Sequence, residues 1–101
     1  MKRIERKKLS DAEINRALEN LEGWKSENGK LTKRFKFKGF MQAMGWMVSV
    51  AIAAEKLDHH PEWSNIYNQV DVALTTHDMD NTISSWDVAL AQTMNDLATR
   101  H

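Results

Sequence analysis

The sequence contains no cysteine and only one proline among its 101 residues. The lack of cysteine excludes disulfide bonds, thiolate metal ligands and a cysteine nucleophile. A run long enough to span a membrane is also missing, because the longest charge-free stretch, residues 39–54, is interrupted by Gln42, Ser49 and two glycines and falls short of the roughly 20 apolar residues required. The charged residues 1–8 lack the apolar core of a secretory signal. We therefore expect a cytoplasmic protein that makes no membrane contact.

An excess of charge of one sign is absent too, since fourteen basic residues balance fourteen acidic ones. The basic residues gather in residues 1–38, where twelve Lys/Arg outnumber six Asp/Glu, whereas residues 39–101 carry two against eight. No basic run interleaves aromatic residues as a nucleic-acid groove would, so we expect no nucleic-acid partner. The length predicts a single domain over residues 1–101, with residues 1–8 as a flexible charged end.

The first half of the chain predicts a helix followed by a hairpin. Ser10 and Glu13 have the spacing of a capping box, and apolar residues at helical spacing continue toward Gly23, which predicts a helix of about three turns. A turn signal at 27–29 precedes a run at 31–38 that mostly alternates apolar and polar residues. This pattern predicts a β-hairpin with one buried face.

The charge-free stretch predicts a long central helix that is apolar on two sides. One apolar side can cover the sheet, but Met41, Val48 and Ile52 leave a second side apolar as well. An apolar outer face on a globular protein is typical of an interface, so we expect self-association through this helix. A methionine-rich cofactor site is the alternative interpretation, and we give it little weight. Pro61 disfavours helical geometry in the residue before it, which places the end of the helix before His59.

The second half predicts another hairpin and a last helix. Residues 63–67 and 70–76 have strand character, and the spacing of Val70, Val72 and Leu74 turns these three toward the core. Ser84 precedes a helical apolar pattern. The expected fold is α+β: one domain with a four-stranded antiparallel sheet covered by three helices, in the order α-β-β-α-β-β-α.

Three of the four histidines follow the predicted ends of elements: His59 and His60 after the central helix, and His77 after a strand. Imidazole titrates near neutral pH, so histidines that converge on one pocket are suited to general acid/base catalysis. A zinc site that includes Asp58 is the main alternative. Neighbouring side chains at i and i+1 diverge and serve one ion poorly, so we favour a site without metal.

Six further residues can line a binding pocket together with these histidines: Glu55, Asp58, Thr75, Thr76, Trp63 and Trp24. The two carboxylates can orient imidazoles or receive substrate N–H groups, or they can simply be solvated. The two indoles can supply walls for a flat ligand or be core residues, and the core role is favoured for Trp24. The two threonines can offer hydroxyl groups to a heterocycle. Asp87 is interpreted as a helix cap, because Ser84 precedes it by three residues.

The run from Glu55 to Trp63 (EKLDHHPEW), together with Asn65-x-Tyr67-Asn68 and Thr75-Thr76-His77, resembles the pterin-4a-carbinolamine dehydratases. The resemblance extends from about Leu9 to Leu97. It implies dehydration of 4a-hydroxytetrahydropterin to quinonoid dihydropterin, a lyase reaction that recycles the tetrahydropterin cofactor and that itself needs no metal or cofactor.

The resemblance also assigns residues. It places the three active histidines at His59, His60 and His77, has Asp58, Thr75 and Thr76 line the pterin site, and puts Glu55 close by. It leaves open which histidine is the acid and which the base; we take His60 and His77 as candidates for those two roles and His59 as a binding or polarising residue.

The resemblance further implies a homodimer or homotetramer that forms through the helix over 39–57 and the sheet edge. Some relatives keep the fold as assembly or transcription-cofactor subunits, so a non-catalytic module that binds a protein partner is the alternative function. One departure from the family is the loop over residues 78–82, which lacks the usual glycine. We expect Asp80 or Asn81 to adopt the left-handed conformation there, and the loop can alter the rim of the pocket.

Overall fold

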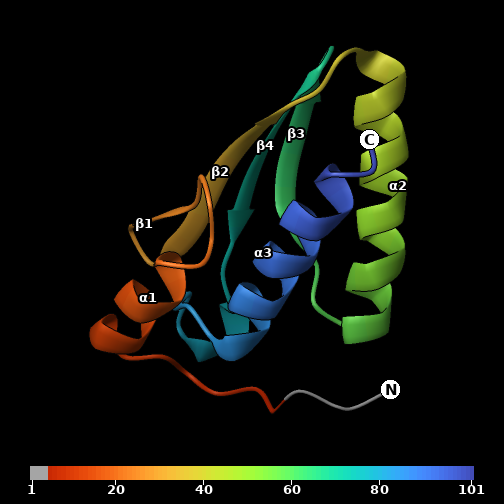
Figure 1. Ribbon diagram of the computed structural model, residues 1–101. Helices are drawn as coiled ribbons and strands as arrows, with labels where there is room; N and C mark the ends of the chain where they lie inside the picture. The colour runs from red at the N-terminus through yellow and green to blue at the C-terminus, as the bar shows by residue number, and fades with distance from the viewer. Residues whose placement is uncertain (1–4) are drawn as a thin grey trace.

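The computed structural model describes residues 5–101, in which three α-helices pack on one face of a four-stranded antiparallel sheet (Figure 1). The elements are α1 (Asp11–Leu18), β1 (Lys25–Glu27), β2 (Lys30–Lys36), α2 (Phe40–Leu57), β3 (Glu62–Ile66), β4 (Gln69–Leu74), the 3₁₀ helix η1 (His77–Met79) and α3 (Ser85–Ala98). The predicted α+β class and the order α-β-β-α-β-β-α are both confirmed.

The sheet consists of two hairpins joined side by side in the order β1-β2-β4-β3. In the first hairpin, Asn28 and Gly29 have φ values of 51° and 77°, as a two-residue turn between antiparallel strands requires. In the second, Val70, Val72 and Leu74 point to the helices and are almost fully buried, which confirms their predicted orientation. Among residues 5–101, no helix lies on the opposite face of the sheet.

The first helix begins where the sequence predicts and ends earlier. The capping box is present, since the backbone N–H of Glu13 donates to Ser10 Oγ over 3.2 Å and the Ser10 N–H donates to Glu13 Oε1 over 2.9 Å. The helix stops at Leu18, and the chain then continues in tight turns with N–H groups bonded to carbonyls three residues back. Apolar spacing alone does not distinguish such turns from a third helical turn.

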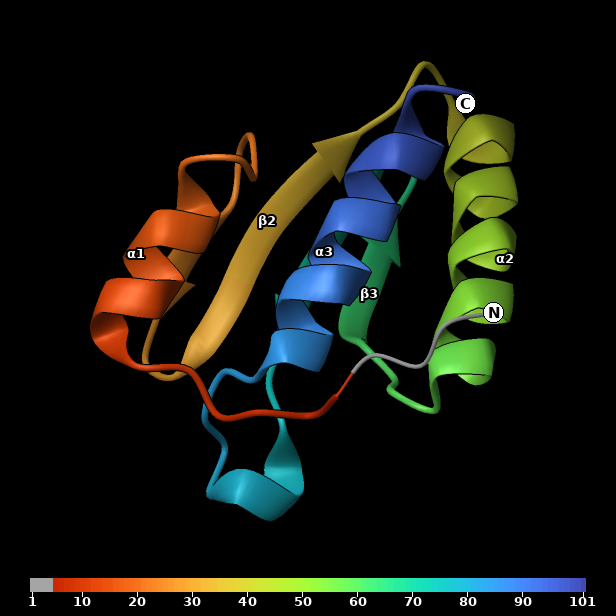
Figure 2. The ribbon, with the colours of Figure 1, turned by 60° about the horizontal axis from the view of Figure 1, so that its bottom comes forward.

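Aromatic side chains fill the core between the sheet and the longer helices. The Trp46 ring of α2 packs against Phe35, Phe37 and Trp63 with centroid separations between 4.4 and 6.1 Å. Its indole N–H donates to the carbonyl of Met94 in α3 over 3.0 Å. This bond fixes α2 against α3. Figure 2 shows the two helices on the same side of the sheet.

Lys33 lies on the face of β2 that points to the core, where the adjacent positions on that face carry apolar residues. Its Nζ donates to the Glu22 carbonyl and to Asn95 Oδ1, each over 2.8 Å. Desolvation lowers the pKa of this amine from its ordinary value, and the charge of Glu22 opposes the shift. The lysine thus links the turn after α1 to α3 at the margin of the core.

Residues 5–8 run across the start of α3. Arg6 pairs with Asp78 of η1 at 2.8 Å. The backbone N–H of Lys7 donates to Ser85 Oγ over 2.9 Å, and the backbone N–H of Ser85 donates to the Lys7 carbonyl over 2.8 Å. The flexibility proposed for residues 1–8 stays a prediction, because residues 1–4 lie outside the described residues.

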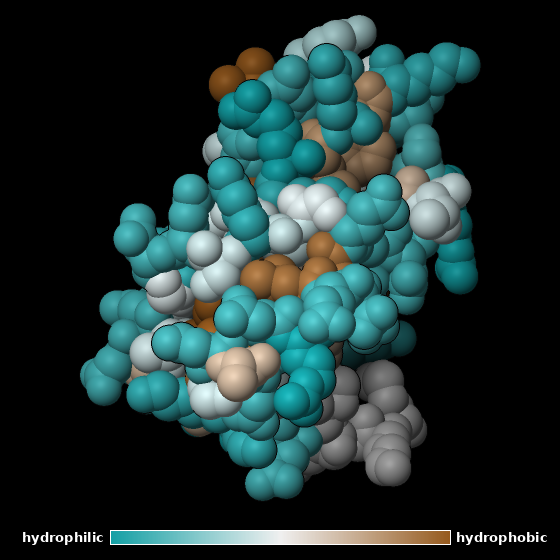
Figure 3. Space-filling model, turned by 60° about the vertical axis from the view of Figure 1, so that its left-hand side comes forward, coloured by the Kyte–Doolittle hydropathy of each residue, from teal (hydrophilic) through white to brown (hydrophobic). Residues whose placement is uncertain are grey.

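The outer face of α2 is the main exposed apolar surface of the described chain. Met41, Val48 and Ile52 are 81%, 59% and 57% exposed. The side of the molecule that carries α1 and β1 is, by contrast, largely hydrophilic with a narrow apolar strip (Figure 3). Within residues 5–101, no helix combines the length and the apolar character needed to cross a membrane.

Candidate functional site

Four chain segments meet at one end of the molecule, and three of them carry predicted site residues (Figures 1 and 2). They are the end of α2, the start of β3, the end of β4 with η1, and the start of α3. Asp58 ends α2 in the left-handed conformation, with φ of 56°. The cap and Pro61 together turn the chain sharply, so that His59 and His60 leave the helix axis, as the sequence predicts.

His59 points inward and is about nine-tenths buried. Its Nε2 lies 2.5 Å from Oδ1 of Asp87, which is fully buried in the first turn of α3. The imidazole and the Trp86 ring form a T-shaped contact, with the centroids 5.8 Å apart. A buried carboxylate in this position fixes the orientation of the imidazole.

Asp87 has two roles in the structure, and the sequence indicated only one of them. As predicted, it caps α3, because its Oδ2 accepts from the backbone N–H of Ser84 over 2.8 Å. The same oxygen accepts from the hydroxyl of Thr76 over 2.8 Å, while the other oxygen faces His59. Asp87 therefore connects the turn after α2 to the end of β4. A capping motif gives no signal of what the second carboxylate oxygen contacts.

His77 lies in η1, directly after Thr76, and has an oxygen partner on each ring nitrogen. Its Nδ1 is 2.8 Å from Oδ1 of Asn81, and its Nε2 is 3.2 Å from Oε2 of Glu62. Glu62 was not among the candidates from the sequence, although it directly follows the histidine pair and Pro61. Asp80 and Asn81 have φ values of 59° and 55°, so the left-handed geometry expected of this loop is confirmed.

His60 faces a different environment. Its Nε2 lies 2.8 Å from Oε1 of Glu55, and both side chains are exposed. The pair borders an apolar hollow on the outer side of α2, lined by Val48, Ala51 and Ile52 among others. The hydrogen bonds thus connect His59 through Asp87 to the segment of His77, while His60 stands beside them with its own carboxylate.

The remaining candidates are divided between the pocket end and the core. The Thr75 hydroxyl donates to the Gly29 carbonyl over 3.0 Å, and Asp58 is exposed at the helix cap. Trp63 is half-buried and packs on the core ring of Trp46. Trp24 is buried, and its indole N–H donates to Asn95 Oδ1 over 3.0 Å. Both threonine hydroxyls therefore already donate within the fold, and Trp24 has the core role that the sequence favours.

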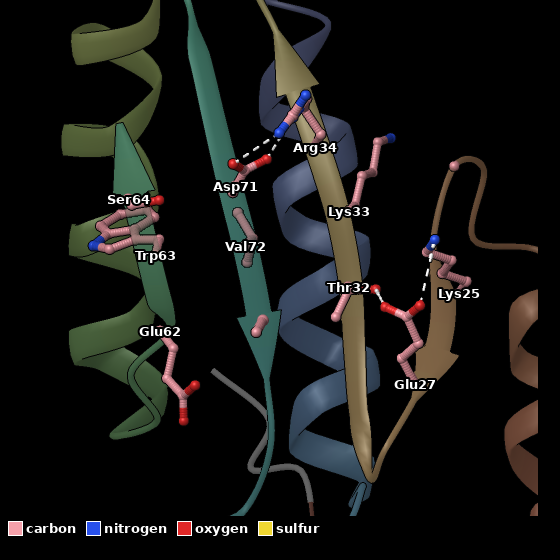
Figure 4. Close-up of a pocket in the computed structure, with 12 residues that line it drawn as sticks. Lys25, Glu27, Thr32, Lys33, Arg34, Glu62, Trp63, Ser64, Asp71 and Val72 are labelled. Carbon is pink, nitrogen blue, oxygen red and sulfur yellow. Dashed lines mark hydrogen bonds and ion pairs between the residues drawn. The ribbon is translucent and has the colours of Figure 1, made fainter. Parts of the chain in front are cut away.

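The helix-free face of the sheet is hollowed, with a cavity volume of about 970 Å³ (Figure 4). Arg34 and Asp71 meet across β2 and β4 at 2.7 Å, and the guanidinium lowers the pKa of Asp71 below its ordinary value. Glu62 borders this hollow at the start of β3. The carboxylate partner of His77 therefore stands where the hollow meets the histidine end of the molecule.

Each of the three histidines has its own carboxylate, and the side chains do not gather into a metal-binding group. In the part of the chain that the structure describes, no three His, Asp or Glu side chains are arranged to hold a metal ion. Imidazoles paired with carboxylates can accept and donate protons near neutral pH. The chemistry that this end of the molecule can supply is general acid/base catalysis.

Comparisons with known proteins identify relatives over nearly the whole chain. Residues 7–97 match the family model described as pterin 4 alpha carbinolamine dehydratase. Proteins from Brucella ovis and Brucella melitensis biotype 1, each named "Putative pterin-4-alpha-carbinolamine dehydratase", are 47% identical over 95 residues, which cover 92% of this chain and 97% of the relative. A crystal structure described as a transcriptional coactivator/pterin dehydratase from Brucella melitensis has a TM-score of 0.86 at 46% identity, covering 90% of this chain and 98% of the other.

Proposed function

The chain belongs to the pterin 4 alpha carbinolamine dehydratase family, and we therefore propose that it dehydrates 4a-hydroxytetrahydropterin to quinonoid dihydropterin by histidine acid/base catalysis. The observation that carries this proposal is the arrangement at one end of the fold. There, the buried His59–Asp87 pair is hydrogen-bonded to Thr76, the residue that precedes His77.

The reaction requires two proton transfers on a bicyclic substrate. The C4a–O bond breaks as the hydroxyl group receives a proton and leaves as water. A ring nitrogen loses a proton, and its electron pair forms the new C=N bond. One group must donate and another must accept, and each such transfer contributes about 10²–10⁴-fold to the rate. We assign these two transfers to His60 and His77.

We assign the binding of the pterin to His59 and its neighbours. Asp87 holds the His59 ring at the buried end of the site, where a fixed imidazole can polarise the substrate. The other residues proposed to line the pterin are Asp58, Glu55, Thr75, Thr76, Trp63 and Trp24. The Thr76 hydroxyl donates to Asp87 and the Trp63 ring packs on Trp46, so these two side chains support the site through the fold. The contact of Trp24 with Asn95, in the second half of α3, supports a core role instead.

A stopped-flow dehydration assay on the wild-type protein tests this function. We expect 4a-hydroxytetrahydropterin near neutral pH to lose water faster with the protein than in buffer, and we expect EDTA to leave that rate unchanged. A rate equal to that of buffer would contradict the proposed activity. Loss of the activity on chelation would instead support the zinc alternative.

A second candidate function is supported by the coactivator description of the solved relative and by the apolar outer face of α2. In this function the chain presents α2 to a protein partner. Replacement of His77 by alanine distinguishes the two functions, because a binding module would keep its affinity for the partner, whereas the dehydratase would lose activity.

We also propose that the chain forms a homodimer or homotetramer, in which copies meet through α2 and a sheet edge. Exposed Val48 and Ile52 lie on the outer side of α2, and burying such side chains stabilises association. Ile52→Lys should shift the protein to a smaller species in analytical ultracentrifugation, because a lysine in the apolar contact would have to be desolvated. The control is Ala12→Lys, at an exposed position on α1. An unchanged sedimentation coefficient for Ile52→Lys would contradict the role of α2.

A further inference from the structure

The ring of His77 is held from two sides by residues that come from different elements. Glu62, at the start of β3, places Oε2 3.2 Å from Nε2. Asn81, after η1, places Oδ1 2.8 Å from Nδ1. The histidine itself is 67% exposed, so packing alone does not fix the direction in which its ring points.

The carboxylate of Glu62 is partly exposed, but contacts other than the one with His77 hold it in place. Its backbone pairs with Ala73 in the sheet, which fixes the position of its Cα. Its other oxygen accepts from Nζ of Lys30 over 2.7 Å. The carboxylate thus joins Lys30 of β2 to His77, and it is held by a strand and an ammonium group at once.

Asn81 is anchored by the closed loop in which it lies. Thr76 donates its backbone N–H to the Thr82 carbonyl over 2.9 Å, and the Thr82 hydroxyl donates to the Met79 carbonyl over 2.7 Å. The carbonyl of Asn81 abuts Gly29, where a Cβ would come within 2.6 Å of it. The left-handed conformation of Asn81 directs its amide back to the imidazole.

The other charged groups of this loop are Asp78 and Asp80. Asp78 forms a two-bond pair with Arg6 at 2.8 and 3.0 Å, and Asp80 caps η1. Glu62, which Lys30 balances, is the charged group that contacts the ring directly among the described residues. The orientation of His77 therefore depends on Glu62 and Asn81.

We propose that Glu62 and Asn81 are positioning residues that act through His77, fixing its ring orientation and its tautomer. In the neutral ring only one nitrogen carries a proton. We assign that proton to Nε2, which donates to the Glu62 carboxylate, and the side-chain amide of Asn81 then turns its N–H group toward Nδ1. Two fixed partners leave the ring little freedom to rotate, and a proton-transfer group that is already aligned avoids the loss of rate that misplacement causes. The catalytic part of this inference rests on the proposed dehydratase function, whereas the structural part does not.

The test uses the full chain with two variants and two matched controls. Glu62→Gln removes the charge and keeps the shape, and Asp71→Asn makes the same change in another carboxylate on that face of the sheet, one that pairs with Arg34. Asn81→Gly removes the amide at a left-handed position that glycine adopts without strain. Asn28→Gly makes the same change at φ of 51° in the β1–β2 turn.

Two measurements are made on each protein: the dehydration kinetics, and the ¹⁵N chemical shifts of the His77 ring at a pH where the ring is neutral. We expect each variant to lower kcat by about tenfold with a smaller change in KM. We also expect the two ring nitrogens, widely separated in the wild type, to move toward each other as the tautomers mix. The controls should match the wild type in both measurements.

The outcomes separate the two proposals. Unchanged ¹⁵N shifts in both variants overturn the positioning role, whatever happens to the rate. Altered shifts with an unchanged kcat overturn it as well, because the orientation would then not matter to catalysis. If the wild type has no dehydratase activity, the proposed function fails, while the ¹⁵N shifts still decide whether Glu62 and Asn81 hold the ring.

Discussion

Replacing His77 by alanine is expected to lower kcat for dehydration by about 10²–10⁴-fold, the usual contribution of one general acid or base. The side chain is largely exposed, and its contacts with Glu62 and Asn81 are surface contacts. Such contacts contribute little to folding, so the free energy of unfolding should change by less than about 1 kcal/mol. Stopped-flow kinetics and urea unfolding measure the two quantities on the same preparation.

The fourth histidine supplies a control for this substitution. His101 lies beside the middle of α2, where its Nε2 is 3.3 Å from Ser49 Oγ, and the proposed chemistry does not use it. His101→Ala should keep the wild-type kcat. A His77→Ala variant that is folded and retains more than about a tenth of the wild-type kcat would remove His77 from the proton transfers.

Replacing Asp87 by alanine is expected to destabilise the fold as well as the site. The carboxylate is fully buried and accepts from the Ser84 N–H and the Thr76 hydroxyl while it faces His59. Truncation leaves these buried groups without their acceptor, and removing one partner of such a network costs about 3–5 kcal/mol. Asp87→Asn keeps one oxygen for the cap but presents an uncharged group to the imidazole, so it should lose activity by about 10²-fold or more with less loss of stability.

The other capping box of the chain offers a matched control. Glu13 stands at the same third helical position of α1 and is exposed, and its pKa is lowered chiefly by the Ser10 backbone N–H. Glu13→Ala should lower the free energy of unfolding in urea only slightly and leave the dehydration rate unchanged. Equal losses of stability for Glu13→Ala and Asp87→Ala would show that the contacts of Asp87 with His59 and Thr76 contribute nothing beyond the cap.

Local patterns predicted those parts of the fold that depend on neighbouring residues. The capping residues Ser10 and Ser84, the hairpin turn at Asn28, and the inward direction of Val70 and Val72 all follow from patterns within a few residues. The same patterns overestimated the length of α1, because apolar residues in tight turns have spacings similar to those in a helix.

The contacts that define the site depend on residues far apart in the chain, and the sequence did not predict them. His59 and Asp87 are 28 residues apart, and Glu62 reaches His77 only because β3 and β4 pair antiparallel. The pair of His60 and Glu55 is local by contrast, and it agrees with the role of orienting an imidazole that the sequence suggested for Glu55. Which carboxylate meets which imidazole is set by how the sheet and helices pack.

The most direct measurement is an NMR titration of histidine-labelled protein with a stable pterin. If the histidine end of the fold binds the pterin, the ring resonances of His59, His60 and His77 should shift along one common binding curve, and His101 should stay unchanged as an internal reference. Ring resonances of all four histidines that do not move at saturating pterin, or a shift at His101 alone, would contradict the proposed site.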